Sequence, residues 1–145
     1  GNKAAKMIEH TSEFFRGFDD IPLHKYLGIT LAEVRPDYAR LRLTRSDQTP
    51  TGIGGSVNGG VIATMVDMAA VAASLNGLSP DVEPAGTADL AVTYLRPAFG
   101  DWVDATASVI KRGRQLSSIE VKVESSEQKL CAHGRVLYAS RVSSN

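Results

Sequence analysis

The stretch VIATMVDMAAVAASL, Val61–Leu75, decides the fold of this chain. It is rich in residues that favour helix, and the Asn76-Gly77 pair that follows it is a good stop signal. The stretch has no polar face, and a helix that is apolar all round is buried all round. Because it is too short to span a bilayer comfortably, it predicts a helix in the core of a folded domain.

Strand-like segments lie on both sides of this helix in the sequence. Residues 27–34 and 39–44, on either side of Pro36-Asp37, predict a β-hairpin before it. Four runs in which apolar residues alternate follow it, at residues 87–94, 103–109, 118–124 and 130–138, with turns at 111–114 and 127–128. Short turns imply antiparallel pairing, and the helix is the only element large enough to cover the apolar faces of the strands. We therefore expect an α+β fold in which a curved antiparallel sheet wraps around one long central helix.

The composition limits the class of protein. The chain has 145 residues, of which 43% are apolar and 22% charged, as expected for a single globular domain over residues 1–145. Residues 1–20 are expected to supply an amphipathic N-terminal helix, at residues 4–15, and the start of a loop at 17–22. The 16 basic and 16 acidic residues cancel, so neither nonspecific nucleic-acid binding nor docking on an anionic membrane is expected.

The single cysteine, Cys131, cannot form an internal disulfide, so a reducing, cytoplasmic setting is expected. No apolar run reaches the length of a membrane span, and residues 1–7 lack the apolar stretch of a secretory signal. The alternation of the last strand places Cys131 and His133 on its outward face. The three histidines show no spacing typical of metal ligands, so no metal is expected.

Asp67 is the sharpest chemical feature, because it is the only charged residue between Val57 and Asp81. A carboxylate among apolar helical neighbours is costly unless it has a polar partner or takes part in chemistry. One interpretation makes Asp67 a general base. The other makes it a buried carboxylate held by Thr64 or by a donor across an interface. We favour the catalytic interpretation, although such carboxylates occur at both kinds of site.

The triplet Asn58-Gly59-Gly60 opens the helix. The first N–H groups of a helix are unpaired, and the helix dipole adds partial positive charge there. Glycines let a substrate approach this backbone closely, which suits an oxyanion hole for a carbonyl group. The alternative is a plain glycine loop in which Asn58 is the helix N-cap, and both interpretations can hold together.

Gly59 and Asp67 are too far apart for one carbonyl group to reach both in a single chain. Their separation of eight residues corresponds to about 12 Å along a helix. Two antiparallel copies of the helix, related by a two-fold axis, bring Gly59 of one subunit beside Asp67 of the other. If both features are catalytic, the chain works at least as a dimer with two sites.

Lys111, Arg112 and Arg114 form a cationic cluster, and Arg96 lies at a strand end that we expect to be nearby. Such residues could hold phosphates. A solvated turn is the alternative, and it is slightly favoured when the cluster is considered alone. No G-x-S-x-G elbow, P-loop or dinucleotide fingerprint is present, which argues against those classes of enzyme.

Three landmarks carry a resemblance to a known family: residues 27–29, Val57–Gly60 followed by Asp67, and Thr87–Pro97. Over residues 23–139 the chain resembles the hotdog-fold acyl-CoA thioesterases of the PaaI-like (phenylacetyl-CoA) and hydroxybenzoyl-CoA type. The resemblance implies a hotdog fold and hydrolysis of an acyl-CoA thioester to free acid and CoA. It also implies a homodimer or a dimer of dimers, and no cofactor beyond the CoA of the substrate.

The same resemblance assigns roles to individual residues. Asp67 matches the base or nucleophile, Gly59 the oxyanion N–H donor, and Thr87 the residue that positions the attacking water. The expected substrate-binding residues are Gly60, Arg96, Lys111, Arg112 and Arg114, the arginines of the 111–114 segment meeting the CoA nucleotide. The family usually has His at the position of Asn58, which can act only by hydrogen bonding, and Asn or Gln at the position of Gly52.

Three other functions stay open at this point. The first is a hotdog protein that binds acyl-CoA without turning it over. The second is a structural or interaction protein in which Asp67 is a hydrogen-bond partner at an interface. The third, a hotdog dehydratase or hydratase, is disfavoured because no histidine is placed beside Asp67 in the sequence.

Overall fold

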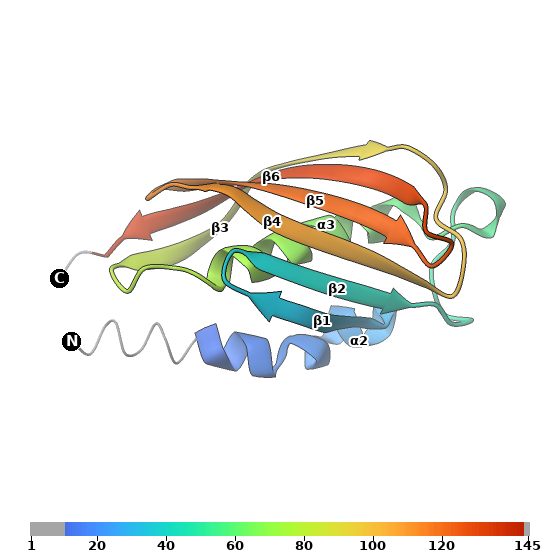
Figure 1. Ribbon diagram of the computed structural model, residues 1–145. Coiled ribbons are helices and arrows are strands. Elements are labelled where there is room, and N and C mark those ends of the chain that lie inside the picture. Colours follow the sequence, from blue (N-terminus) through green and yellow to red (C-terminus); the bar gives the residue numbers. More distant parts are fainter. Residues whose placement is uncertain (1–10, 144–145) are drawn as a thin grey trace.

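The sheet has six strands in the order β1-β2-β4-β5-β6-β3, and each neighbouring pair is antiparallel. The structure is a computed structural model that describes residues 11–143 (Figure 1). The strands are β1 (Ile29–Arg35), β2 (Tyr38–Thr44), β3 (Val82–Tyr94), β4 (Trp102–Arg112), β5 (Leu116–Ser125) and β6 (Leu130–Val142), and the long helix is α3 (Gly59–Leu75). The predicted hairpin, core helix and four later strands are therefore confirmed.

The helix α3 lies against the inner face of the sheet, which curves around it (Figure 1). Leu41 and Val121 of the sheet and Met65 and Val66 of the helix are all fully buried. Each large side chain buried in this way contributes about 1.5–3 kcal/mol relative to its exposed state. Within residues 11–143, no helix is long and apolar enough to cross a membrane. The apolar surface of α3 is thus covered by the sheet of its own chain.

Gly134 on β6 marks a very close approach between the helix and the sheet. A Cβ atom at this position would collide with the Cγ1 methyl group of Val66. The strand has little freedom to move away, because β6 is hydrogen-bonded between β5 and β3. Glycine is required here for close packing rather than for a turn.

The N-terminal region differs in part from the prediction. Residues 11–16 are helical, and the rest of the expected 4–15 helix lies outside the described residues. The predicted loop at 17–22 contains a 3-10 turn, η1 (Phe18–Asp20), and ends one residue earlier than expected, because a short helix that was not predicted, α2 (Pro22–Leu27), begins at Pro22. Pro22 favours the start of α2, and Gly28, with a left-handed φ of 75°, ends it. These elements lie along β1 (Figure 1), which consequently begins at Ile29.

All four later strands are longer than predicted, and one residue faces the other way. β3 begins at Val82, and β4 continues to Arg112, so part of the predicted turn at 111–114 is strand. Cys131 is buried rather than outward-facing. The pairing of β5 with β6 shifts at this point, since Val123 lies opposite Ala132 but Glu124 lies opposite Leu130. The resulting β-bulge takes Cys131 out of the alternation.

His133, by contrast, lies on the outer face as expected. Its Nε2 atom is 2.8 Å from Oε1 of Glu120 on the neighbouring strand β5.

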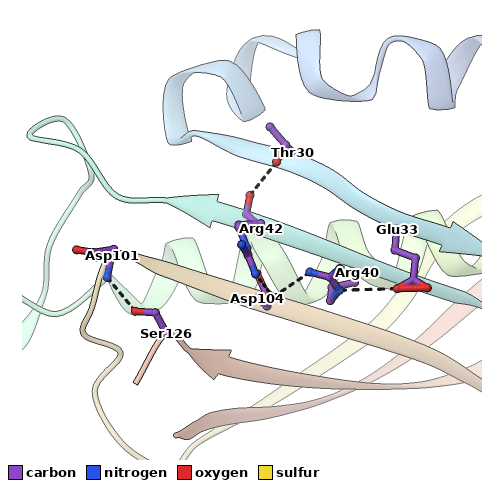
Figure 2. A network of polar contacts seen from close by, with 7 residues as sticks. All are labelled: Thr30, Glu33, Arg40, Arg42, Asp101, Asp104 and Ser126. Atoms are coloured by element: carbon purple, nitrogen blue, oxygen red, sulfur yellow. Dashed lines mark hydrogen bonds and ion pairs between the residues drawn. The ribbon is translucent and has the colours of Figure 1, made fainter. Parts of the chain in front are cut away.

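The outer face of the sheet carries a network of ion pairs around Asp104 of β4 (Figure 2). Asp104 is only 8% exposed, and it accepts hydrogen bonds from Arg40 Nη1 at 3.1 Å and Arg42 Nε at 2.8 Å. The hydrogen bond to Asp104 raises the pKa of Arg42, whose guanidinium also lies 3.8 Å from the centroid of the Trp102 ring. Two cations from β2 around one carboxylate thus fix β2 against β4.

We predict that Gly134→Ala lowers the free energy of unfolding by roughly 1–3 kcal/mol, because the added methyl group has no space beside Val66. Urea denaturation followed by circular dichroism measures the change. In the double variant Gly134→Ala/Val66→Ala the colliding methyl groups are removed, so its loss should be smaller than the sum of the two single losses. Strictly additive losses would contradict the close-packing explanation.

Candidate functional site

The helix α3 begins with Asn58 as its N-cap. Asn58 Oδ1 accepts hydrogen bonds from the N–H groups of Gly60 at 2.8 Å and Val61 at 3.3 Å. The Asn58 carbonyl oxygen accepts from Val61 and Ile62. The N–H group of Gly59 has no acceptor among residues 11–143. The N-cap interpretation of Asn58 is therefore confirmed, and it leaves Gly59 as the free donor of the first helical turn.

A cavity of about 610 Å³ opens beside this helix start. Gly59 and Gly60 line it, together with Arg96 and mostly apolar residues. The apolar lining residues are Ile53, Val57, Ile62, Leu95, Pro97, Ala98 and Cys131. The loop that carries Ile53 projects beyond the end of the sheet (Figure 1), and the Ile53 side chain is 85% exposed. A free N–H donor at the N-terminus of a helix thus adjoins an apolar cavity.

Asp67 lies in the middle of α3 and is held by Thr87 of β3. Thr87 Oγ1 donates a hydrogen bond to Asp67 Oδ1 at 2.6 Å, while Asp67 Oδ2 has no partner among residues 11–143. Thr64 does not hold the carboxylate, because its hydroxyl donates instead to the carbonyl oxygen of Gly60 at 3.0 Å. Asp67 is half-buried rather than enclosed, since it faces β3, one of the two edge strands of the sheet. The structure therefore brings together two of the predicted site residues and leaves one carboxylate oxygen free.

Tyr138 of β6 lies close to this pair and was not expected at the site. It pairs with Thr87 in the register of the two strands, and it is only 5% exposed. Burial raises the pKa of Tyr138, the nearby Asp67 carboxylate raises it further, and the backbone N–H group of Gly86 acts in the opposite direction. Its phenol therefore stays neutral. The alternation of β6 indicated only that Tyr138 points inward, and its nearness to Asp67 depends on the packing of α3.

Asp67 and Thr87 do not line the cavity that contains Gly59. This separation agrees with the distance of about 12 Å along the helix. Within one chain, the free amide and the carboxylate therefore lie at two separate places on α3.

The predicted cations do not gather in one chain. Arg96 lines the cavity at the start of α3, whereas Arg112 donates to the Ala73 carbonyl oxygen at 3.3 Å, near the end of the helix. A 17-residue helix is about 25 Å long, so the expectation that Arg96 lies near Arg112 is wrong. Arg112 also donates to Asp37 Oδ1 at 2.7 Å from its Nη2 atom.

The other two cations of the 111–114 segment are more accessible than Arg112. Lys111 is exposed. Arg114 Nη2 lies 3.0 Å from Asp81 Oδ2, but both side chains are exposed, and exposed ion pairs are weak. Within residues 11–143, no three His, Cys, Asp or Glu side chains gather as a metal site would require.

A curved antiparallel sheet wrapped around one buried helix defines the hotdog class of domain. Residues 54–132 match the family model described as the thioesterase superfamily. The chain belongs to this family, which confirms the predicted family and its hydrolase class.

Individual relatives agree with this assignment. A protein of Halobacterium salinarum is 37% identical over 108 residues, which are 72% of this chain and 71% of the relative. The medium/long-chain acyl-CoA thioesterase YigI of Escherichia coli K12 is 28% identical over 131 residues, which are 81% of this chain and 84% of the relative. The structure of the E. coli PaaI protein from the phenylacetic acid degradation operon has a TM-score of 0.77 and 23% identity, and the match covers 96% of this chain and 99% of that chain. This last similarity confirms the predicted hotdog fold.

We predict that Asn58→Ala lowers the free energy of unfolding by about 1 kcal/mol, because the cap of α3 is lost. Thermal unfolding measured by calorimetry tests the change. The matched control is Asn58→Asp, which keeps an acceptor for Gly60 and Val61 and places a negative charge at the helix start, so it should retain the stability of the wild type. Equal stability of the alanine variant and the wild type would contradict the capping role.

Proposed function

We propose that this chain hydrolyses an acyl-CoA thioester to a free acid and CoA. The observation that carries the proposal is the free N–H group of Gly59 beside an apolar cavity, on the same helix as the Thr87-held Asp67. The similarity to YigI, a medium/long-chain acyl-CoA thioesterase, supports the substrate class. The apolar cavity supports an apolar acyl group, since its walls offer few partners for a polar one.

In the proposed reaction, the thioester carbonyl oxygen accepts a hydrogen bond from Gly59 N–H. This donor and the helix dipole stabilise the negative charge that develops on that oxygen in the transition state. The free oxygen of Asp67 removes a proton from water, and the water oxygen attacks the carbonyl carbon. The carbon–sulfur bond then breaks, and the CoA sulfur takes up the proton as the acid is released. In the second form of the proposal, Asp67 attacks the carbonyl carbon directly, the carbon–sulfur bond breaks, and the CoA thiolate leaves and takes up a proton. Water then hydrolyses the resulting anhydride to the free acid and the Asp67 carboxylate.

Both forms require two chains, because the two half-sites, the Gly59 amide and the Asp67 carboxylate, lie apart within a single chain. β3 is the suitable contact, since it has β6 on one side and no strand on the other within residues 11–143. The opposite edge is less suitable, because the Leu31 N–H group of β1 already donates to Asp19 Oδ1 at 2.8 Å. Two copies paired antiparallel along β3 form one continuous sheet and bring Gly59 of each chain toward Asp67 of the other. A homodimer, or a dimer of such dimers, is therefore part of the proposal.

The remaining substrate contacts follow from the positions of the basic residues. Gly60 and Arg96 adjoin the cavity and are proposed to contact the substrate near the thioester. Lys111 and Arg114 are the accessible cations for the CoA phosphates, with Arg112 behind them in its pair with Asp37. We also propose a reducing, cytoplasmic setting, which the free thiol of Cys131 supports.

We predict that Asp67→Asn lowers thiol release about 10²- to 10⁴-fold while the dimer persists, because an amide cannot take up the proton. The measurement is a thiol-release screen across aryl, short-chain and long-chain acyl-CoAs, with the oligomeric state determined by light scattering. Asp47→Asn, a change at an exposed loop residue, is the matched control and should leave turnover unchanged. Unchanged turnover in Asp67→Asn would overturn the mechanism. Tight binding of acyl-CoA by the wild type without thiol release would favour the non-catalytic alternative.

We further predict that two inactive variants complement each other in a mixed dimer. Gly59→Pro removes the free N–H group at the first helical position, where proline is well tolerated, and should lower kcat about 10²- to 10³-fold. Gly59→Ala keeps this N–H group and measures separately the cost of adding a side chain at this position. In a dimer of one Gly59→Pro chain and one Asp67→Asn chain, one of the two sites combines the intact Gly59 with the intact Asp67.

The mixed dimer, isolated with two different affinity tags, should therefore recover about half of the wild-type activity. No recovery would show that each site is built within one chain.

A further inference from the structure

Two hydroxyl groups of β3 hold the two half-sites of α3. Thr87 donates to the carboxylate of Asp67, as described above. Tyr94, the last residue of the same strand, donates from its Oη atom to the carbonyl oxygen of Gly59 at 2.5 Å. The start and the middle of the helix are thus tied to one strand. Thr87 has a role in the proposed function, whereas Tyr94 has none so far.

Tyr94 covers Gly59 as well as bonding to it. A Cβ atom built on Gly59 would lie 3.5 Å from two carbon atoms of the Tyr94 ring, which is ordinary van der Waals contact. The Tyr94 side chain is nevertheless 54% exposed, and it lines the same cavity as Gly59 and Gly60. A large aromatic residue that is half exposed contributes less to the core than a buried one does, so a purely structural role explains its position poorly.

The start of α3 needs such a contact because it consists of two consecutive glycines. Glycine has more backbone freedom than any other residue, so a Gly-Gly helix start does not by itself fix the direction of its peptide groups. Asn58 fixes the N–H groups of Gly60 and Val61. Tyr94 fixes the carbonyl group on the other side of the Gly59 Cα atom. The Gly59 N–H group belongs to the same peptide group as the Asn58 carbonyl, which accepts from Val61 and Ile62, and Tyr94 holds the following peptide group. The free donor thus lies in a segment that is held on both sides.

We propose that Tyr94 is a positioning residue, whose hydroxyl group holds Gly59 so that the free N–H of this glycine meets the thioester carbonyl oxygen. This inference rests on the proposed function. It also assigns a second task to β3, which carries the positioning hydroxyl for each half-site and is the strand proposed to pair with the partner subunit. The register of β3 in the dimer then sets the distance between Gly59 of one chain and Asp67 of the other.

The test is the variant Tyr94→Phe, which keeps the ring against Gly59 and removes only the hydroxyl group. We expect kcat for the acyl-CoA that the wild type turns over fastest to fall about tenfold, less than in Gly59→Pro, because the donor remains but is held less well. KM should change by less than about twofold, since the ring and the cavity wall remain. Tyr26→Phe, at an exposed tyrosine of α2, is the matched control and should have the kcat of the wild type.

A double-mutant cycle separates positioning from general stability. In Tyr94→Phe/Gly59→Pro the N–H group that Tyr94 would position is absent, so the double variant should be no slower than Gly59→Pro alone. Additive losses of kcat would overturn the proposal, as would a Tyr94→Phe variant with the wild-type kcat.

A spectroscopic measurement tests the contact without turnover. Loss of the hydroxyl donor should shift the ¹³C resonance of the Gly59 carbonyl in Tyr94→Phe, and Tyr26→Phe should leave it in place. An unchanged Gly59 resonance in Tyr94→Phe would overturn the proposal even if kcat had fallen. Failure of the proposed function has a different signature, because the wild type itself would then release no thiol from any acyl-CoA of the screen.

Discussion

The contact between α3 and the inner face of the sheet is the interaction on which the other features depend. The helix has no polar face, so it is stable only where apolar side chains cover it from several sides. β2, β4, β5 and β6 provide this cover with alternating aliphatic residues, and the close approach at Gly134 shows how little space separates the helix from the sheet. The only charged side chain of α3, that of Asp67, is therefore confined to the side that faces the edge strand β3.

The position of Asp67 and the cap at Asn58 together explain how one helix carries two chemically different groups. At its start, Asn58 occupies the N–H groups of Gly60 and Val61 and leaves that of Gly59 free. In its middle, Asp67 faces β3, an edge strand of the sheet, and Thr87 holds one of its oxygens. A fully enclosed carboxylate would have carried a much larger desolvation penalty. Because β3 has an open edge, Asp67 stays accessible although α3 is buried, and a second chain can pair with the sheet beside it.

Much of this arrangement follows from local patterns in the sequence. The apolar run at 61–75 and the alternation in the strands predicted the helix, the sheet and the inward faces, because both patterns record burial directly. The family resemblance placed Asp67 and Thr87 in one site but gave Thr87 the task of positioning water, so their hydrogen bond was not predicted. The short helix α2 was missed because its signals, Pro22 and Gly28, are also those of a loop.

Other features depend on contacts between distant segments, which no local pattern contains. The burial of Cys131 follows from a bulge in the pairing of β5 with β6. Arg96 and Arg112 were grouped by charge, but they lie at opposite ends of α3. The contact of Tyr94 with Gly59 joins residues that are 35 positions apart in the chain. The cap at Asn58, in contrast, was predictable because its partners are its immediate neighbours.

The missing side chain of Gly134 has a consequence for the direction of the carboxylate. Val66 occupies the space above Gly134, which limits rotation of α3 about its own axis. Successive residues of a helix are rotated by about 100°, so the azimuth of Val66 also sets that of Asp67, the next residue. With Val66 directed at β6, Asp67 turns toward the adjacent strand β3 and meets Thr87. The close packing of Val66 on Gly134 thus limits the rotation of α3 and directs the Asp67 carboxylate toward β3.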